Sequence, residues 1–163
     1  MFNFNSLPDL IVYDFDGVMT DNTAMVSENG IESVKINRSD GLAISHLKKL
    51  GLKQIIISTE MNKVVLTRAK KLKIECYHDI GNKQEVLEIF CDKNSINVSN
   101  VLFIGNDIND KEAMELSGYT MCPSDAHKSI LNLADHVFQR KGGEGVIREL
   151  LDLILESKFY LHK

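Results

Sequence analysis

Four aspartates on two short turns are the residues in this sequence whose type and spacing best suit chemistry. One turn reads Asp14-Phe15-Asp16-Gly17 and the other reads Asp107-Ile108-Asn109-Asp110. Carboxylates that lie a few ångströms apart repel one another unless a cation or a basic side chain holds them, and Mg²⁺ prefers oxygen ligands in octahedral geometry. The pattern therefore points to a cation site, although calcium loops, helix caps and solvated turns also use Asp-x-Asp.

The spacing of the first turn also suits phosphoryl transfer. A carboxylate is a known nucleophile that attacks phosphorus and forms an aspartyl phosphate. A second carboxyl group two residues further on can protonate the leaving alcohol and later take a proton from water. Asp14 and Asp16 are therefore candidates for the nucleophile and the general acid/base.

Each acidic turn directly follows a short apolar run that is typical of a buried central strand. The runs Leu10–Tyr13 and Val101–Ile104 are rich in branched and aromatic side chains, as are the central strands of parallel sheets. Open α/β sheets bind ligands beyond the carboxyl ends of their strands. We therefore expect both turns at the same edge of one parallel sheet.

The rest of the chain alternates strand-like and helical segments, which predicts βαβ units and an α/β fold class. Further strands are expected at residues 54–57, 74–77, 119–122 and 137–138. Helices are expected from a cap at Ser39 or Asp40 to Gly51, from a cap at Asn62 to Leu72, and over 83–91, 111–116, 126–133 and 145–155. An Asn-Gly turn between the extended runs 23–26 and 32–36 predicts a small hairpin just after the first acidic turn.

Length and composition fit one ordinary soluble domain over residues 1–163. Hydrophobic residues make up 44% of the chain, charged residues make up 26%, and the net charge is −4, which is a common balance for a globular protein. A negative chain gives no reason to expect nucleic acid or an acidic membrane as a partner, because phosphate groups demand a basic face. No run approaches the ~20 apolar residues of a membrane span. Three scattered cysteines without C-x-x-C spacing suggest a reduced, cytoplasmic chain.

Four motifs, in chain order, resemble the signatures of the haloacid dehalogenase superfamily of phosphohydrolases. They are residues 10–20, residues 55–58, Lys83 and residues 105–110. A hairpin at about 21–37 stands where many members have a large cap domain, and residues 38–41, 123–127 and 142–149 resemble the capless subgroup. This resemblance spans about residues 8–155. It implies a three-layer α/β/α Rossmann-like fold with a parallel central sheet and a small β-hairpin in place of a cap domain.

The resemblance also implies roles for individual residues. Asp14 would be the nucleophile and a Mg²⁺ ligand, and Asp16 would be the general acid/base, with its backbone carbonyl on the metal. Ser58 would hydrogen-bond the transferring phosphoryl group, and Lys83 would offset the negative charge. Asp110 fits a position behind the site that orients Lys83 or a metal-bound water. On its own, Lys83 would be read as a solvated lysine at a helix start.

The fourth motif departs from the superfamily pattern at one position. The residue after its glycine is usually a metal-binding Asp, whereas here it is Asn106. An amide oxygen can coordinate Mg²⁺ but brings no charge, so weaker metal affinity is expected. Alternatively Asp107 takes the metal position, or turnover is lost. In the last case the chain would be a catalytically weak, oligomerising domain associated with an acylneuraminate cytidylyltransferase.

The expected substrate follows from the capless subgroup. That subgroup contains phosphatases of 3-deoxy-octulosonate 8-phosphate and of nine-carbon ulosonate 9-phosphates, so a small phosphorylated sugar acid of cell-surface sugar synthesis is implied. A phosphatase of another small metabolite is a further possibility, because fold does not fix substrate. The expected substrate-binding residues are Asp40, Thr59, Glu60, Arg68, Lys71 and Arg148. Glu60 and Lys71 resemble a pair of residues that favours nine-carbon ulosonates. The sequence fits equally well with Glu60 at an exposed helix start and Lys71 on an exposed helix face, without a role in substrate binding.

The resemblance further implies a homotetramer. In capless relatives the hairpin packs against neighbouring subunits, and a Gly-rich C-terminal segment closes a neighbour's active site. Here the corresponding segment and its helix span about residues 141–163. Its glycines would equally suit a plain loop at a helix start.

Overall fold

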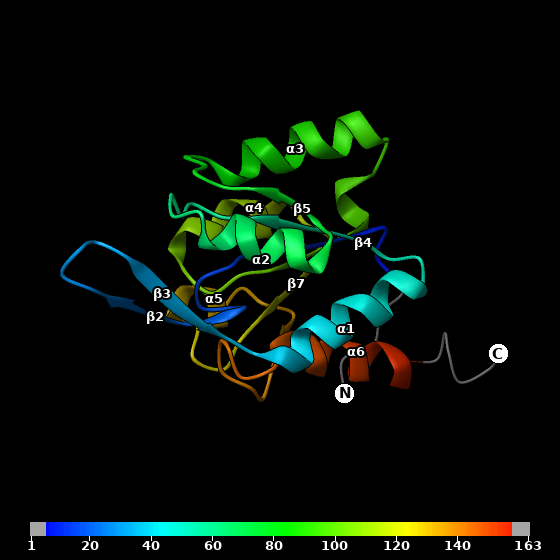
Figure 1. The fold of residues 1–163 in the computed structure, drawn as a ribbon. Coiled ribbons are helices and arrows are strands. Elements are labelled where there is room, and N and C mark those ends of the chain that lie inside the picture. The colour runs from blue at the N-terminus through cyan, green and yellow to red at the C-terminus, as the bar shows by residue number, and fades with distance from the viewer. Residues whose placement is uncertain (1–5, 158–163) are drawn as a thin grey trace.

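A six-stranded parallel sheet forms the centre of the computed structural model, which describes residues 6–157 (Figure 1). The strand order is β5-β4-β1-β6-β7-β8. The strands are β1 (Leu10–Tyr13), β4 (Lys53–Ile57), β5 (Glu75–Tyr77), β6 (Val101–Ile104), β7 (Tyr119–Cys122) and β8 (His136–Val137). Tyr13 pairs with Ile56 of β4 and with Ile104 of β6. The carboxyl ends of the three central strands therefore lie side by side.

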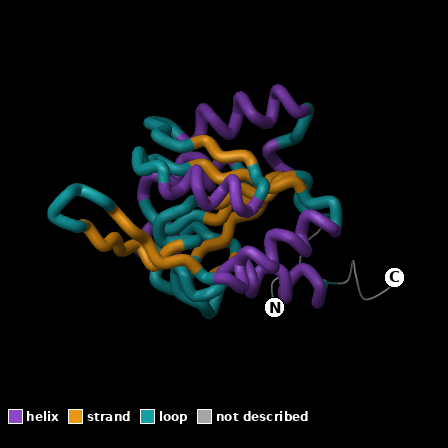
Figure 2. The backbone as a smooth tube through the Cα atoms, in the orientation of Figure 1, coloured by secondary structure: helices purple, strands orange, loops and turns teal. Residues whose placement is uncertain are grey.

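Helices cover both faces of the sheet and produce the expected three layers (Figure 2). One face carries α1 (Arg38–Lys49), α2 (Val64–Leu72) and α6 (Val146–Glu156), and the other carries α3 (Lys83–Asn94), α4 (Lys111–Leu116) and α5 (Lys128–Leu131). The side chains of β1 alternate between the two cores, with Ile11 and Tyr13 in one and Leu10 and Val12 in the other, as the period of a strand requires. None of the described helices is long and apolar enough to cross a bilayer.

An antiparallel hairpin projects from this body directly after the first acidic turn (Figure 1). It consists of β2 (Thr20–Val26) and β3 (Glu32–Ile36). Its base lies against the carboxyl edge of the sheet, where several of its side chains line a cavity, and its outer part is exposed. Between β1 and α1 the described chain holds only this hairpin, so the predicted fold class is confirmed.

The predicted cap of α1 was wrong. The helix begins at Arg38, and the Asn37 side chain caps it by accepting a hydrogen bond from Ser39 N at 2.8 Å. Asp40 instead accepts a hydrogen bond from the backbone N–H of Arg148 at 3.0 Å, across to α6. A capping residue upstream satisfies the first turn, which leaves the aspartate available for a contact between helices.

Candidate active site

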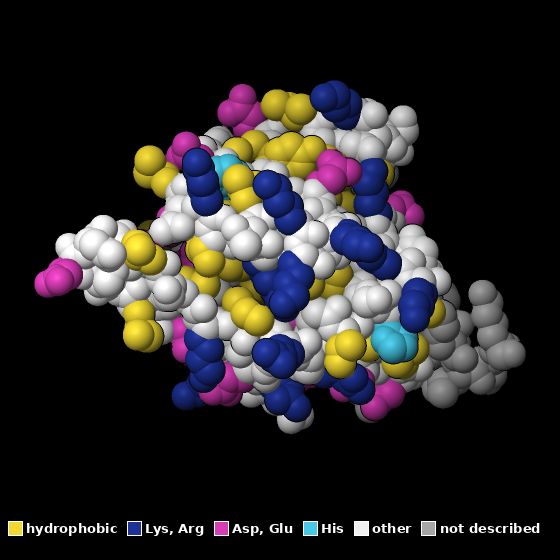
Figure 3. All heavy atoms as spheres, in the orientation of Figure 1, with side chains coloured by type: hydrophobic (Ala, Val, Ile, Leu, Met, Phe, Trp, Pro, Cys, Tyr) yellow, Lys and Arg dark blue, Asp and Glu magenta, His cyan; other side chains and the backbone are white. Residues whose placement is uncertain are grey.

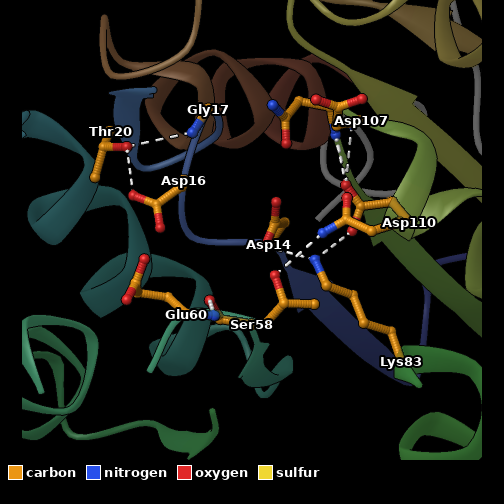
Figure 4. Close-up of polar contacts among 12 residues, drawn as sticks. Asp14, Asp16, Gly17, Thr20, Ser58, Glu60, Lys83, Asp107 and Asp110 are labelled. Carbon is orange, nitrogen blue, oxygen red and sulfur yellow. Dashed lines mark hydrogen bonds and ion pairs between the residues drawn. The ribbon is translucent and has the colours of Figure 1, made fainter. Parts of the chain in front are cut away.

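Polar turns from three strands meet at the carboxyl edge of the sheet (Figure 4). Asp14 and Asp16 follow β1, Ser58 follows β4, and Asn106 and Asp107 follow β6. Because these strands pair in register, the turns converge on one cavity of about 620 Å³. Both acidic turns therefore lie at one sheet edge, as the sequence predicted.

The cavity is strongly acidic. Its walls are the strand-end turns, the base of the hairpin and the segment that leads into α2. Five of the lining side chains are carboxylates, and none of the lining residues is Lys, Arg or His; the carboxylates belong to Asp14, Asp16, Glu32, Glu60 and Asp107. Carboxylates this close together favour a bound cation.

Lys83 does not line the cavity, but it neutralises part of this charge by pairing with Asp14. Its Nζ lies 2.7 Å from Asp14 Oδ1 and 2.5 Å from Asp110 Oδ1 (Figure 4). All three side chains are buried. One ammonium between two carboxylates leaves a net negative charge in a desolvated place, which is costly without a further cation. The contact expected between Asp110 and Lys83 is present.

The protonation of this cluster follows from burial and charge. Burial raises the pKa of Asp14 to about 7, Asp110 adds to the rise, and Lys83 offsets only part of it. Burial alone would lower the pKa of Lys83, but attraction to the two carboxylates outweighs it and raises that pKa. Lys83 therefore stays charged, and Asp14 is the carboxylate of the pair that binds a proton more readily than usual.

The Asn106 amide lies beside two oxygen acceptors of the first acidic turn. One atom of the Asn106 amide lies 2.8 Å from Asp14 Oδ2 and 2.9 Å from the backbone oxygen of Asp16. With the amide oxygen at this place, three acceptors meet without a donor, an arrangement that suits a cation between them. Neighbouring oxygen ligands of an octahedral Mg²⁺ lie about 2.9 Å apart. With the amide turned over, its nitrogen donates to both oxygens instead.

These residues therefore fit a hard divalent cation. The candidate ligands are one carboxylate, one backbone carbonyl and one amide. Only one of the three is a carboxylate, which agrees with the finding that no group of three or more His, Cys, Asp or Glu residues within residues 6–157 could hold a metal ion. Asp107 lines the cavity, but its Oδ1 accepts from the backbone N–H of Ile108 at 2.7 Å. Of the two alternatives for the fourth motif, the geometry favours Asn106 over Asp107.

Thr20 fixes the second aspartate of the first turn. Its Oγ1 donates to Asp16 Oδ1 at 3.0 Å and accepts from the backbone N–H groups of Gly17 at 3.2 Å and Asn22 at 3.3 Å (Figure 4). Burial raises the pKa of Asp16, and the hydrogen bond from Thr20 opposes part of that rise. Sequence reasoning did not single out Thr20, although a hydroxyl four residues after an aspartate in a tight turn is a usable signal.

Two of the expected substrate-binding residues reach the cavity. Thr59 and Glu60 line it together with Ser58. Ser58 Oγ accepts the backbone N–H of Glu60 at 3.1 Å, which leaves the hydroxyl proton of Ser58 free to donate. The hairpin adds Asn22 and Glu32, which sequence reasoning missed because the fold of the hairpin over the site is a tertiary feature.

The other four expected substrate-binding residues, Asp40, Arg68, Lys71 and Arg148, lie outside the cavity of their own chain. Asp40 is buried between α1 and α6. Arg68 Nη2 donates to the backbone oxygen of Asn37 at 3.2 Å. Lys71 and Arg148 are exposed on helices. Within one chain these residues do not contact the cavity, so a substrate role would require a second copy.

Comparison with known proteins places the chain in a family. Residues 45–150 match the model for haloacid dehalogenase-like hydrolases. The 3-deoxy-D-manno-octulosonate 8-phosphate phosphatase KdsC of Escherichia coli K12 is 32% identical over 147 residues, which cover 90% of this chain and 78% of KdsC. N-acylneuraminate cytidylyltransferase A of Danio rerio is 30% identical over 151 residues, which cover 91% of this chain and 35% of that protein.

Solved structures share the same fold. A protein described as a HAD family hydrolase from Streptomyces avermitilis is 40% identical with a TM-score of 0.89, covering 92% of this chain and 89% of that one. The octulosonate 8-phosphate phosphatase of Yersinia pestis is 30% identical with a TM-score of 0.89, covering 95% and 84%. The Moraxella catarrhalis phosphatase, in complex with magnesium, phosphate and KDO, is 26% identical with a TM-score of 0.89, covering 95% and 90%.

The three-layer fold and the acidic strand ends define an α/β enzyme with its site at the carboxyl edge of a parallel sheet. The chain belongs to the haloacid dehalogenase-like hydrolase family. The expected family is therefore confirmed, and the expected enzyme class, a phosphoric monoester hydrolase, is the class of the bacterial relatives named above.

Proposed function

We propose that this chain is a cytoplasmic, Mg²⁺-dependent phosphatase of a phosphorylated ulosonic acid, either octulosonate 8-phosphate or a nine-carbon 9-phosphate. One observation carries the proposal: Asp14 Oδ2 and the Asp16 carbonyl oxygen both lie within 2.9 Å of one atom of the Asn106 amide, and the other Asp14 oxygen pairs with a buried lysine. The names of the bacterial relatives and the ligands of the Moraxella catarrhalis enzyme support the substrate class and the metal.

The residues divide the work of hydrolysis in two steps. Asp14, whose carboxylate would also help to hold the metal, attacks phosphorus as the bond to the sugar oxygen breaks, and an aspartyl phosphate forms. Asp16 gives a proton to the leaving sugar oxygen, and its raised pKa suits this acid role. It later takes a proton from the water that attacks phosphorus, which breaks the bond to the Asp14 oxygen, releases inorganic phosphate and restores the Asp14 carboxylate. Ser58 and Lys83 stabilise the phosphoryl oxygens and the nucleophile. A bound Mg²⁺ supplies further positive charge against the phosphate.

The carboxylate of a sugar acid requires a cation that the cavity of one chain lacks. Among the described lining residues no side chain is basic. A second copy could supply one. Arg148 is exposed on α6, and among residues 6–157 its guanidinium pairs with the half-exposed Asp152 of the same helix. We therefore extend the proposal to a homotetramer whose subunits complete one another's sites, because a planar guanidinium matches a carboxylate.

A second candidate function is a catalytically weak domain that partners a cytidylyltransferase. The similarity to the Danio rerio protein supports it. So does the Asn106 amide, because in its turned orientation the nitrogen donates to Asp14 Oδ2 and to the Asp16 carbonyl. An asparagine can thus close the site without a cation, which an ionised aspartate cannot do.

The test is phosphate release from octulosonate 8-phosphate and nine-carbon 9-phosphates over a range of Mg²⁺ concentrations. Asp14→Asn should lower kcat about 10³-fold or more, because the nucleophile is lost. Asp92→Asn, at an exposed position of α3, is the matched control and should stay within about twofold of the wild type. No release by the wild type at any Mg²⁺ concentration would reject the phosphatase and favour the second candidate.

A further inference from the structure

Two glycines between β8 and α6 lie directly against the loop that carries Asp16. Gly142 and Gly143 are buried. A Cβ atom at Gly142 would lie 2.2 Å from the backbone oxygen of Gly17, and one at Gly143 would lie 2.6 Å from the backbone nitrogen of Asp21. Both distances are shorter than any real contact of a methyl group. Backbone therefore packs on backbone here, and only glycine fits.

Hydrogen bonds fix this contact. The backbone N–H of Gly143 donates to Val18 O at 3.0 Å. The backbone N–H of Gly142 donates to Asp125 Oδ1 at 2.9 Å. Asp125 is an exposed residue in the loop between β7 and α5, so it holds the glycine pair in place from outside the core.

The same β7–α5 loop also holds the opposite side of the cation site. The backbone N–H of His127 donates to the backbone oxygen of Asn106 at 2.7 Å. The loop thus connects to the Asp16 turn through the glycine pair and to the Asn106 turn directly. Between them, Gly17 packs so closely on Asn106 that a Cβ atom would lie 2.0 Å from Nδ2.

We propose that Gly142 and Gly143, tethered by Asp125, are positioning residues that set the separation between the Asp16 carbonyl and Asn106. The inference rests on the proposed function and extends it, because it gives the Gly-rich segment a role in the site of its own chain. A methyl group at Gly142 would have to push the 17–20 backbone away by roughly 1 Å. Thr20 would carry the Asp16 side chain with it, and a misplacement of this size costs about 10²-fold in rate.

Gly142→Ala tests the contact cleanly, because the backbone of Gly142 is outside the left-handed region and alanine meets no intrinsic strain there. Gly81→Ala is the matched control, since a Cβ atom at that loop position meets nothing within 4 Å and its backbone is likewise unstrained. For Gly142→Ala we expect a Kd for Mg²⁺ at least about tenfold higher and a kcat about 10²-fold lower. Both values should stay within about twofold in Gly81→Ala.

A second pair of variants keeps the test valid if Gly142→Ala does not fold. Asp125→Ala removes an exposed acceptor and should weaken Mg²⁺ binding severalfold, whereas Asp125→Asn keeps an oxygen for the Gly142 N–H and should restore it. Mg²⁺ affinity is measured by calorimetry without substrate. The amide ¹⁵N shifts of residues 14–21 in the metal-free protein report the position of the loop directly.

The outcomes separate the two proposals. A folded Gly142→Ala protein with wild-type Mg²⁺ affinity and unchanged amide shifts at Asp16 and Gly17 would overturn the positioning role, even if its melting temperature fell. A wild-type protein that neither binds Mg²⁺ nor releases phosphate would overturn the proposed function instead. In that case the amide shifts still decide whether the glycine pair positions the loop.

Discussion

Asn106 sets the electrostatic character of the site. Its amide lies 2.8 Å from Asp14 Oδ2, where an aspartate would place a second negative charge beside a carboxylate whose pKa burial already raises to about 7. Without a metal, that second charge would be costly. With a metal, it would strengthen binding. The asparagine therefore avoids a second negative charge beside Asp14, and we expect it to give a lower affinity for a cation than an aspartate would.

Asn106→Asp should tighten Mg²⁺ binding about tenfold, because affinity for hard cations rises with the charge of the ligands. Compared with the wild type, the variant should have a lower melting temperature in the presence of a chelator and a higher one in excess Mg²⁺. Calorimetry and thermal unfolding measure the two effects. Asn109→Asp is the matched control, since it adds the same charge to the same cavity at a side chain that donates to Thr59 Oγ1.

Equal tightening by both variants would show that general charge matters and coordination does not. An unchanged Kd in Asn106→Asp would remove this residue from the ligands of the metal and make Asp107 the better candidate. These outcomes test the alternative that the sequence left open between the two neighbours.

At the residue scale, the sequence predicted the positions of groups that sit at strand ends. Asp14, Ser58 and Asn106 converge because a parallel sheet aligns the carboxyl ends of β1, β4 and β6. Thr20 escaped prediction because its value depends on the tight turn that brings its hydroxyl to Asp16 and Gly17. When the role of a side chain depends on the local geometry of a turn, neither the amino-acid composition nor the hydrophobic periodicity of the sequence reveals it.

Among the elements, the pairing of α1 with α6 depends on a cap that comes from another helix. α6 begins at Val146, and the residue before it, Gly145, has no side chain that could cap the helix. Asp40 of α1 accepts from the backbone N–H of Arg148 at that helix start. Burial nevertheless raises the pKa of Asp40 to about 6, and its Oδ2 has no hydrogen-bond partner within the described part of the chain. The ionised carboxylate therefore costs stability even though it caps a helix.

Asp40 should make the protein less stable as the pH rises. Its pKa is raised from 3.8 to about 6 in the folded chain, so between these values the folded state holds more protons than the unfolded state. The stabilisation that the protonated Asp40 gives to the folded state is complete below about pH 4 and is lost as the pH rises past about 6. The free energy of unfolding should fall by about 3 kcal/mol over this range. Urea denaturation from pH 4 to pH 7 measures it.

Asp40→Asn keeps an oxygen for the helix start and removes the titration. The difference in free energy of unfolding between this variant and the wild type should therefore grow in favour of the variant across that pH range. Asp79→Asn, at an exposed loop position, should run parallel to the wild type. A constant difference for Asp40→Asn would show that the buried carboxyl group does not titrate in this range.

The strands and longer helices were predictable because their apolar periods are strong, but the contacts between helices were not. Ser39 and Asp40 both have the chemistry of a cap, yet Asn37 takes that place in α1. The partner of Asp40 lies 108 residues further along the chain. Local sequence signals identify a residue that is able to cap a helix, and only the packing decides which helix it caps.

At the scale of the whole molecule, the alternation of strands and helices was enough to predict the layers and the edge of the sheet that carries the site. The cavity was less predictable, because the hairpin closes one side of it with residues such as Asn22 and Glu32. Matching of motifs also assigned substrate roles to Lys71 and Arg148, which lie outside this cavity. A sequence motif gives the position of a residue along the chain. It does not say whether that residue contributes to the site of its own subunit or to the site of a neighbouring subunit.

The projecting hairpin is where a homotetramer would be held together. Its exposed apolar side chains include Met25, 78% exposed, Val26 and Ile31, and hydrophobic side chains stand on it in Figure 3. Exposed apolar side chains that lie near one another would suit a contact between subunits. Four chains of 18.4 kDa give a mass of about 74 kDa, which light scattering should find for the wild type. Met25→Glu should shift the protein to smaller species, because a charge would be buried in the contact.

Ile89→Glu is the control for this change, since Ile89 is an apolar residue of α3 that is 56% exposed and lies away from the hairpin. The mass of this variant should remain that of the wild type.

If a neighbouring copy supplies the cation for the substrate, Met25→Glu should raise KM about tenfold or more for a sugar-acid phosphate. It should hardly change KM for p-nitrophenyl phosphate, which has no carboxylate to pair. A monomeric wild type that turns over the sugar-acid phosphate would exclude the shared site, and equal losses on both substrates would mean that assembly supports only the fold.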